Sequence, residues 1–140
     1  MTSGLRRHDR AMGRRPLAAI TIAALVVALA GSSADARPPV QRRGPCATEP
    51  TRWGLTVQRG MVPGTLRIRF VIRVATPGDA WQVALSDGPR GLPAVDRVVG
   101  ANGGFRVVRV IRNGPGPDRI MASATNKADG TQTCLGAITF

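Results

Sequence analysis

The chain has 140 residues and carries 20 lysines and arginines against 8 acidic residues, which gives a formal net charge of +12 at pH 7. A chain of this length forms one small domain with a two-layer core, which excludes multidomain enzymes, large barrels and nucleotide-binding sheets with several crossovers. The single histidine, His8, lies in an N-terminal segment that we expect to be removed. The remaining chain would then lack the commonest general base near neutral pH.

Residues 1–36 have the order of a secretory signal: a start with five arginines, an uncharged apolar run over 17–30, and small residues at the exit. The apolar run is shorter than the roughly 20 residues that cross a bilayer, so we expect no permanent membrane span. Cleavage fits after Ala30 and after Ala36, and the second is favoured because it leaves a spacer behind the apolar run. The pair Arg14-Arg15 leaves twin-arginine export open as an alternative.

The only two cysteines, Cys46 and Cys134, lie near opposite ends of the part that would be exported. Outside the cell such a pair is normally a disulfide, whereas inside the cell it is more often two free thiols. A metal site would need more ligands, and no Cys-x-x-Cys motif or remaining histidine supplies them. We therefore predict a disulfide, a secreted or cell-envelope location, and no metal or cofactor.

Residues 37–45 are rich in proline and arginine, and we interpret them as an extended, solvated arm. From Cys46 onward, short segments with a period of two are separated by Gly, Pro, Asn and Asp, which is typical of an all-β sandwich or barrel. Seven strands are predicted, near residues 53–57, 66–74, 81–85, 95–99, 105–112, 120–125 and 131–140.

The clearest strand is LRIRFVIRV, over residues 66–74, whose even-numbered apolar residues would face the core up to Val74. Its polar face would then carry three arginines, Arg67, Arg69 and Arg73. In FRVVRVIR, over 105–112, the alternation slips, and a β-bulge at Val107-Val108 would bring two further arginines to one solvated face, Arg106 and Arg109.

These elements predict a single Greek-key sandwich over residues 46–140. The strand count, the inward-facing Trp81 in what would be the third strand (AWQVAL), and the closing hairpin ATNKADGTQTC resemble a secreted bacterial immunoglobulin-like or fibronectin type III-like domain. The resemblance is architectural and covers roughly residues 50–140. It implies a binding or spacing module rather than a catalyst.

The residues needed for catalysis are scarce. Of the six acids beyond residue 36, four lie beside Gly or Pro in predicted turns, where Asp commonly bonds its own backbone: Asp79, Asp87, Asp118 and Asp129. A two-carboxylate glycosidase would need two acids together in a cleft, and calcium would need six or more oxygen ligands. At least three of the five aromatic residues are predicted to face the core, which argues against a sugar platform. We predict no catalytic and no metal-binding residues.

The abundance of arginine is the sequence feature that does point to a function, since residues beyond 36 include fourteen arginines and one lysine. Guanidinium groups bind phosphate and carboxylate in bidentate fashion, so five residues are candidates for binding a polyanion: Arg67, Arg69, Arg73, Arg106 and Arg109. Charges at every second position also keep a sheet face soluble, and this interpretation stands beside the first. The leading hypothesis is an exported, non-catalytic module that acts by surface contact, structural or adhesive in kind. The alternative is a binder of an acidic cell-surface polymer or nucleic acid, and another surface protein stays open as a partner.

Overall fold

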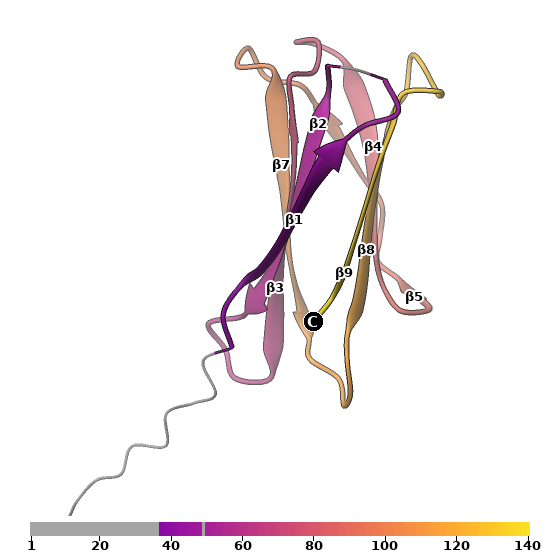
Figure 1. The fold of residues 1–140 in the computed structure, drawn as a ribbon. Helices are drawn as coiled ribbons and strands as arrows, with labels where there is room; N and C mark the ends of the chain where they lie inside the picture. The colour runs from indigo at the N-terminus through magenta and orange to yellow at the C-terminus, as the bar shows by residue number, and fades with distance from the viewer. Residues whose placement is uncertain (1–36, 49) are drawn as a thin grey trace, which may run out of the picture. The chain divides into compact units, whose positions relative to one another are not determined.

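The computed structural model describes residues 37–48 and 50–140, so the predicted signal over 1–36 and both cleavage points lie outside the described residues. These residues form two antiparallel sheets that stack as a sandwich (Figure 1). Sheet A contains, in spatial order, β1 (Val40–Pro45), β2 (Arg52–Arg59), β3 (Thr65–Arg73) and β7 (Gly104–Arg112). Sheet B contains β5 (Arg90–Gly91), β4 (Ala80–Asp87), β8 (Arg119–Asn126) and β9 (Thr133–Thr139), and β6 (Val95–Val98) also pairs with β4.

The chain changes sheet three times, between β3 and β4, between β6 and β7, and between β7 and β8. These crossings place β7 beside β3 and β8 beside β4, which is a Greek-key connection rather than a simple meander. The predicted all-β sandwich is confirmed. The described part has nine strands rather than seven, because the sequence patterns did not reveal β1 and the two-residue strand β5.

The core lies between the inner faces of the two sheets, where β3, β4, β8 and β9 bury every second residue over most of their length. In β3 the side chains of Leu66, Ile68, Phe70 and Ile72 are fully buried, as their alternation predicted. Trp81 of β4 is also fully buried and lies with its ring centroid 6.2 Å from that of Phe105. The prediction that Trp81 faces the core is confirmed. In the middle of β8 and β9 the inward residues are small, with Ala122 opposite Gly136 and Ala124 opposite Cys134.

The segment 37–45, expected to be a solvated arm, contains an edge strand. Its residues 40–45 pair along their whole length with β2, from Val40 opposite Val57 to Pro45 opposite Arg52. A proline is tolerated there because an edge strand leaves one side of its backbone unpaired. The segment is extended and largely exposed, but it is part of sheet A.

The prediction of a β-bulge at Val107-Val108 is wrong. The ladder between β3 and β7 is continuous over nine residue pairs, so the alternation of β7 is unbroken. A bulge would have brought both Arg106 and Arg109 to the same solvated face. Because β7 is an edge strand, a long arginine side chain on its inner face reaches solvent past the edge, and no bulge is needed.

Two further boundaries differ from expectation. Val74 does not continue the inner face of β3: it has a positive φ of 59° and is 55% exposed. The last strand begins at Thr133 rather than Thr131, and Asp129 lies within the preceding loop, where its Oδ1 accepts hydrogen bonds from the backbone N–H and the hydroxyl of Thr131.

The predicted disulfide joins Cys46, directly after β1, to Cys134 of β9, with 4.3 Å between the Cα atoms. It therefore links an edge strand of sheet A to an edge strand of sheet B. The backbone N–H of Ala47 reinforces this link by donating to the carbonyl of Thr133 at 2.7 Å. No helix that could cross a membrane occurs within residues 37–48 and 50–140.

Candidate anion-binding face

The outer face of sheet A is dominated by arginine. Residues that lie opposite one another in an antiparallel ladder point to the same side of the sheet, so the register identifies this face strand by strand. It carries one arginine from β1, one from β2, three from β3 and two from β7. We call this set the arginine face: Arg43, Arg52, Arg67, Arg69, Arg73, Arg106 and Arg112.

The register makes these arginines a continuous track across the sheet. Arg52 lies directly opposite Arg73, and Arg43 lies opposite Gly54 and is therefore diagonal to Arg52. On the other side of β3, Arg106 lies opposite Val71 and is therefore diagonal to both Arg69 and Arg73. Opposite and diagonal neighbours in such a ladder are about 5 to 8 Å apart at their Cβ atoms.

Of the five arginines predicted from the sequence, the structure brings four together on this face, Arg67, Arg69, Arg73 and Arg106. Arg109 is not among them, because it lies opposite the fully buried Ile68 and thus on the core-facing side of β7. Its Nη1 donates to the carbonyl of Val108 at 3.4 Å. Without a bulge, Arg106 and Arg109 have opposite orientations.

Three arginines of the face are not among the five predicted candidates: Arg43, Arg52 and Arg112, the last of which ends the predicted strand 105–112. Arg43 lay in the presumed arm, and Arg52 lay one residue before the alternating residues 53–57. The parity of β2 offered a signal for Arg52, since Leu55 and Val57 face the core and residues 52, 54 and 56 must then face outward. Nothing in the sequence indicated that residues 40–45 would pair beside them.

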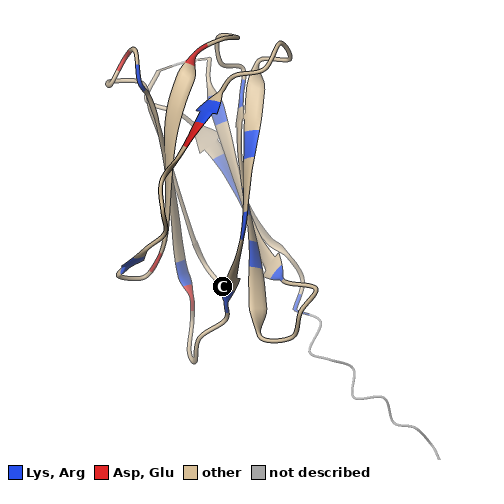
Figure 2. Cartoon of the chain, turned by 180° about the vertical axis from the view of Figure 1, so that it is seen from behind, with Lys and Arg blue, Asp and Glu red and all other residues tan. Residues whose placement is uncertain are grey.

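Charge is unevenly divided between the two sheets. The four strands of sheet A contain ten arginines and no acidic residue. The described aspartates all belong to the strands of sheet B or to loops, and Figure 2 shows blue segments repeated along sheet A and red ones near strand ends and loops. In the part of the chain that the structure describes, no ion pair involves Arg67, Arg69, Arg73, Arg106 or Arg112. Within the described residues, the positive charge of these five arginines is therefore not neutralised by an ion pair.

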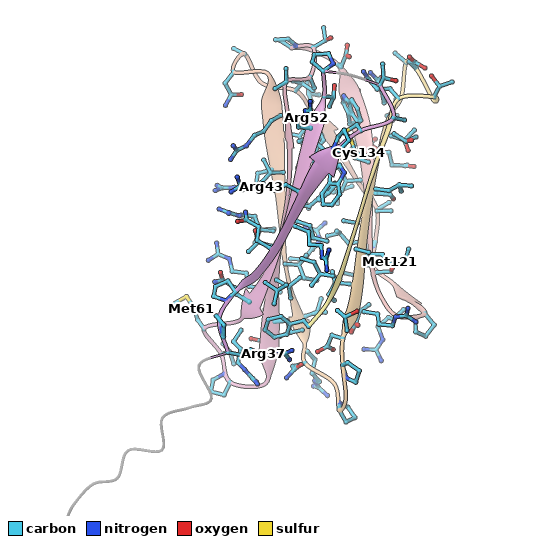
Figure 3. The ribbon with its side chains drawn as sticks, in the orientation of Figure 1. Arg37, Arg43, Arg52, Met61, Met121 and Cys134 are labelled. Carbon is cyan, nitrogen blue, oxygen red and sulfur yellow. A yellow bond between two sulfur atoms is a disulfide. The ribbon has the colours of Figure 1, made fainter. Side chains whose placement is uncertain are left out.

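The arginine face is hollowed near its centre. A cavity of about 360 Å³ lies over Gly54, and its lining includes Thr56 and four arginines: Arg43, Arg52, Arg69 and Arg73. The side chain of Arg43 lies along this hollow, because its Cγ is 3.8 Å from the position that a Cβ of Gly54 would take. The Nη2 of Arg43 donates to Gln41 Oε1 at 3.3 Å, which helps to orient the guanidinium. Figure 3 shows Arg43 on the side of the sandwich away from Met121 of sheet B.

A wider hollow of about 1190 Å³ adjoins the first and shares four lining residues with it, Arg69, Val71, Arg73 and Val74. Arg106 also lines this wider hollow. Val74 directly follows β3 and has a left-handed backbone, a conformation that costs a β-branched residue about 1–3 kcal/mol. The hydroxyl of buried Thr51 donates to its carbonyl at 3.2 Å and helps to hold this turn. Arg73, the residue before this turn, lines both hollows.

The acidic residues do not form a comparable site. Among residues 37–48 and 50–140 there is no group of three or more potential metal ligands. Asp118 is buried, and both this burial and the nearby negative charge of Asp87 raise its pKa above the ordinary value. The backbone of Asp118 pairs with that of Phe140 through two hydrogen bonds of 3.0 and 2.9 Å, which ties the last residue to the β7–β8 loop.

Aromatic side chains are lacking on the arginine face, as far as the described residues of sheet A show. Trp53 and Phe105 lie opposite Ile72 on β3's two sides and so belong to the inner face. The ring of Trp53 lies against Gly44 and Gly136, where an added Cβ would approach it to within 2.9 and 2.7 Å. The face therefore offers charge and hydrogen-bond donors but no ring on which a base or a sugar could stack.

The fold and this face define a class of protein: a disulfide-linked, all-β sandwich with one strongly cationic sheet. Comparison with protein-family models finds no matching family, and comparison with curated proteins finds no matching relative.

Proposed function

We propose that this protein is an exported, non-catalytic binding module that holds an acidic polymer against the arginine face. The observation that carries the proposal is the single sign of charge on sheet A, whose four strands contain ten arginines and no acidic residue. Guanidinium groups are suited to this task because they bind phosphate, sulfate and carboxylate groups as planar forks.

Solubility alone does not require such a face. Natural surfaces usually intersperse both signs of charge, since like charges at neighbouring sheet positions repel one another. Here Arg106 is diagonal to both Arg69 and Arg73, and none of these three arginines forms an ion pair within the described residues. A bound polyanion would relieve this repulsion and release counterions, and both effects would favour binding.

The proposal includes an immunoglobulin-like or fibronectin type III-like architecture. The supporting features are the pairing of β7 with β3 and of β8 with β4 across two sheets, and the buried Trp81 on β4. Export is supported by the disulfide, because disulfides persist in oxidising compartments. The mass of the purified product of the full chain tests export, since cleavage after Ala30 or Ala36 and oxidation of both thiols change it by known amounts.

Binding is tested by retention on immobilised polyphosphate and on heparin as a function of salt concentration. The variant R67S/R69S/R73S should elute at lower salt, and the slope of log affinity against log salt should fall by about 2, at about 0.7 per lost contact. The matched control is R90S/R97S/R119S, which removes the same charge from strands of sheet B.

The control variant should keep most of the retention of the parent protein. Equal losses in the two triple variants would show that only net charge matters, and unchanged retention in R67S/R69S/R73S would refute the proposed function outright.

A further inference from the structure

Gly54 is unexplained by the fold itself. It lies in the middle of β2 on the outer face, and glycine in a strand interior weakens the strand. Its backbone does not have the positive φ that favours glycine, because the positive-φ residues lie elsewhere. An added Cβ would meet nothing closer than Arg43 Cγ at 3.8 Å, which is ordinary van der Waals contact.

The other two glycines in the strands of sheet A differ in this respect. A Cβ on Gly44 would come within 2.9 Å of the Trp53 ring, and a Cβ on Gly104 would come within 2.5 Å of the carbonyl oxygen of Ile72. Packing therefore accounts for those two glycines and not for Gly54. Because Gly54 has no side chain, the hollow that it lines stays open at this position.

The donors around this hollow approach from different strands. Arg43 borders it from β1, Arg52 from β2, and Arg69 and Arg73 from β3, where they flank Val71 at positions two residues away on either side. The hydroxyl of Thr56 adds a further donor beside the floor. The volume of about 360 Å³ falls within the range of roughly 300–1,000 Å³ that is usual for small-ligand sites.

We propose that the hollow over Gly54 is a discrete site for one tetrahedral oxyanion, a phosphate or sulfate ester group of the bound polymer. A planar carboxylate is satisfied by one bidentate arginine, whereas a terminal phosphate presents three strong acceptor oxygens to donors on several sides. The inference rests on the proposed function and adds to it a fixed point of recognition within an otherwise diffuse electrostatic surface.

The test fills the hollow without removing a charge. In Gly54→Val the side chain occupies the site, and the fold should keep its stability because valine favours strands and the first carbon has room. Gly91→Val is the matched control, since Gly91 lies in β5 of sheet B and has open space around it. Circular dichroism and thermal unfolding check that both variants fold.

Binding of inorganic phosphate, inorganic sulfate and acetate is then followed by NMR on the backbone amides. In the parent and in Gly91→Val, phosphate and sulfate should shift the amides of residues 52–56 and 69–73 saturably, with weaker effects from acetate. Gly54→Val should weaken phosphate and sulfate binding at least tenfold. Competition with polyphosphate and with dextran sulfate identifies which ester the site prefers.

Equal phosphate and sulfate affinity in Gly54→Val and the parent would overturn the site, as would the lack of saturable shifts in the parent. Acetate binding as tight as that of phosphate would overturn the tetrahedral assignment. These outcomes leave the proposed function standing as long as R67S/R69S/R73S loses retention on the polymer. If that triple variant binds polymer like the parent, the proposed function fails whatever Gly54→Val does.

Discussion

Arg109 lies directly opposite Ile68 in the ladder between β3 and β7, which places a cation on the core-facing side of an edge strand. The same relationship recurs at two other edges, where Arg42 of β1 lies opposite the buried Leu55 and Arg97 of β6 lies opposite the buried Trp81. Inward-pointing charges are one way in which sheets prevent a foreign strand from pairing with an open edge. These three arginines therefore have a different role from those of the arginine face.

Replacing Arg109 by valine should leave the domain folded but make it prone to association. The exposed edge of β7 would then carry a continuous apolar inner face that invites another strand. We expect unfolding free energy to change by less than about 1 kcal/mol, as for other surface substitutions, while light scattering shows larger species at the same concentration. Arg112→Val, on the outer face of the same strand, is the control with equal charge. Identical association of the two variants would contradict the edge role.

Truncation of Trp81 to alanine should cost about 3–5 kcal/mol of unfolding free energy, because its side chain is fully buried beside Phe105. Its Nε1 has no hydrogen-bond partner among the described residues. Trp81→Phe should therefore cost much less, since it keeps most of the apolar volume and removes the unpaired N–H. Denaturant unfolding measures both. A loss below about 1 kcal/mol in the alanine variant would argue against the core position.

Removal of the disulfide by the double variant C46S/C134S should destabilise the domain substantially. The two cysteines are 88 residues apart, and the chain-entropy model gives about 4–5 kcal/mol for closing a loop of that length. A small domain has about 5–15 kcal/mol in total, so the variant should be marginally stable and should melt at a much lower temperature. The prediction would be contradicted if C46S/C134S melted at the same temperature as the oxidised parent, or if reduction left the melting temperature of the parent unchanged.

Asp118 should make stability depend on pH. Burial and the charge of Asp87 raise its pKa in the folded protein above the ordinary value of 3.8, so the folded state holds this proton more tightly than the unfolded chain does. The stability contributed by this proton is present below pH 3.8 and is lost as the pH rises through the folded pKa. Thermal unfolding from roughly pH 3 to 6 measures it, within the range where carboxyl groups titrate.

Over that range, Asp118→Asn should gain melting temperature relative to the parent as the pH rises, because asparagine carries no proton to lose. Asp87→Asn should reduce the same dependence, since it removes the neighbouring negative charge. Parallel curves for the parent and Asp118→Asn across the range would show that the carboxyl of Asp118 titrates normally.

The sequence determined the local features of this protein. The period of two in residues 66–72 fixed which side chains of β3 are buried, because successive side chains on a strand point to opposite faces. Two cysteines allow only one intramolecular pairing, and their disulfide is present. The polar alternate residues of β3 gave Arg67, Arg69 and Arg73 their outward position before any neighbour of that strand was known.

Only the tertiary structure decided which strands lie beside β3. Pairing with β2 and β7, and the addition of β1 to the edge, brought Arg43, Arg52 and Arg106 to the same surface and left Arg109 on the other. It also placed Gly54 among four arginines that come from three strands. Register between distant strands depends on how all the inner faces fit together, and a period within one segment carries no information about it.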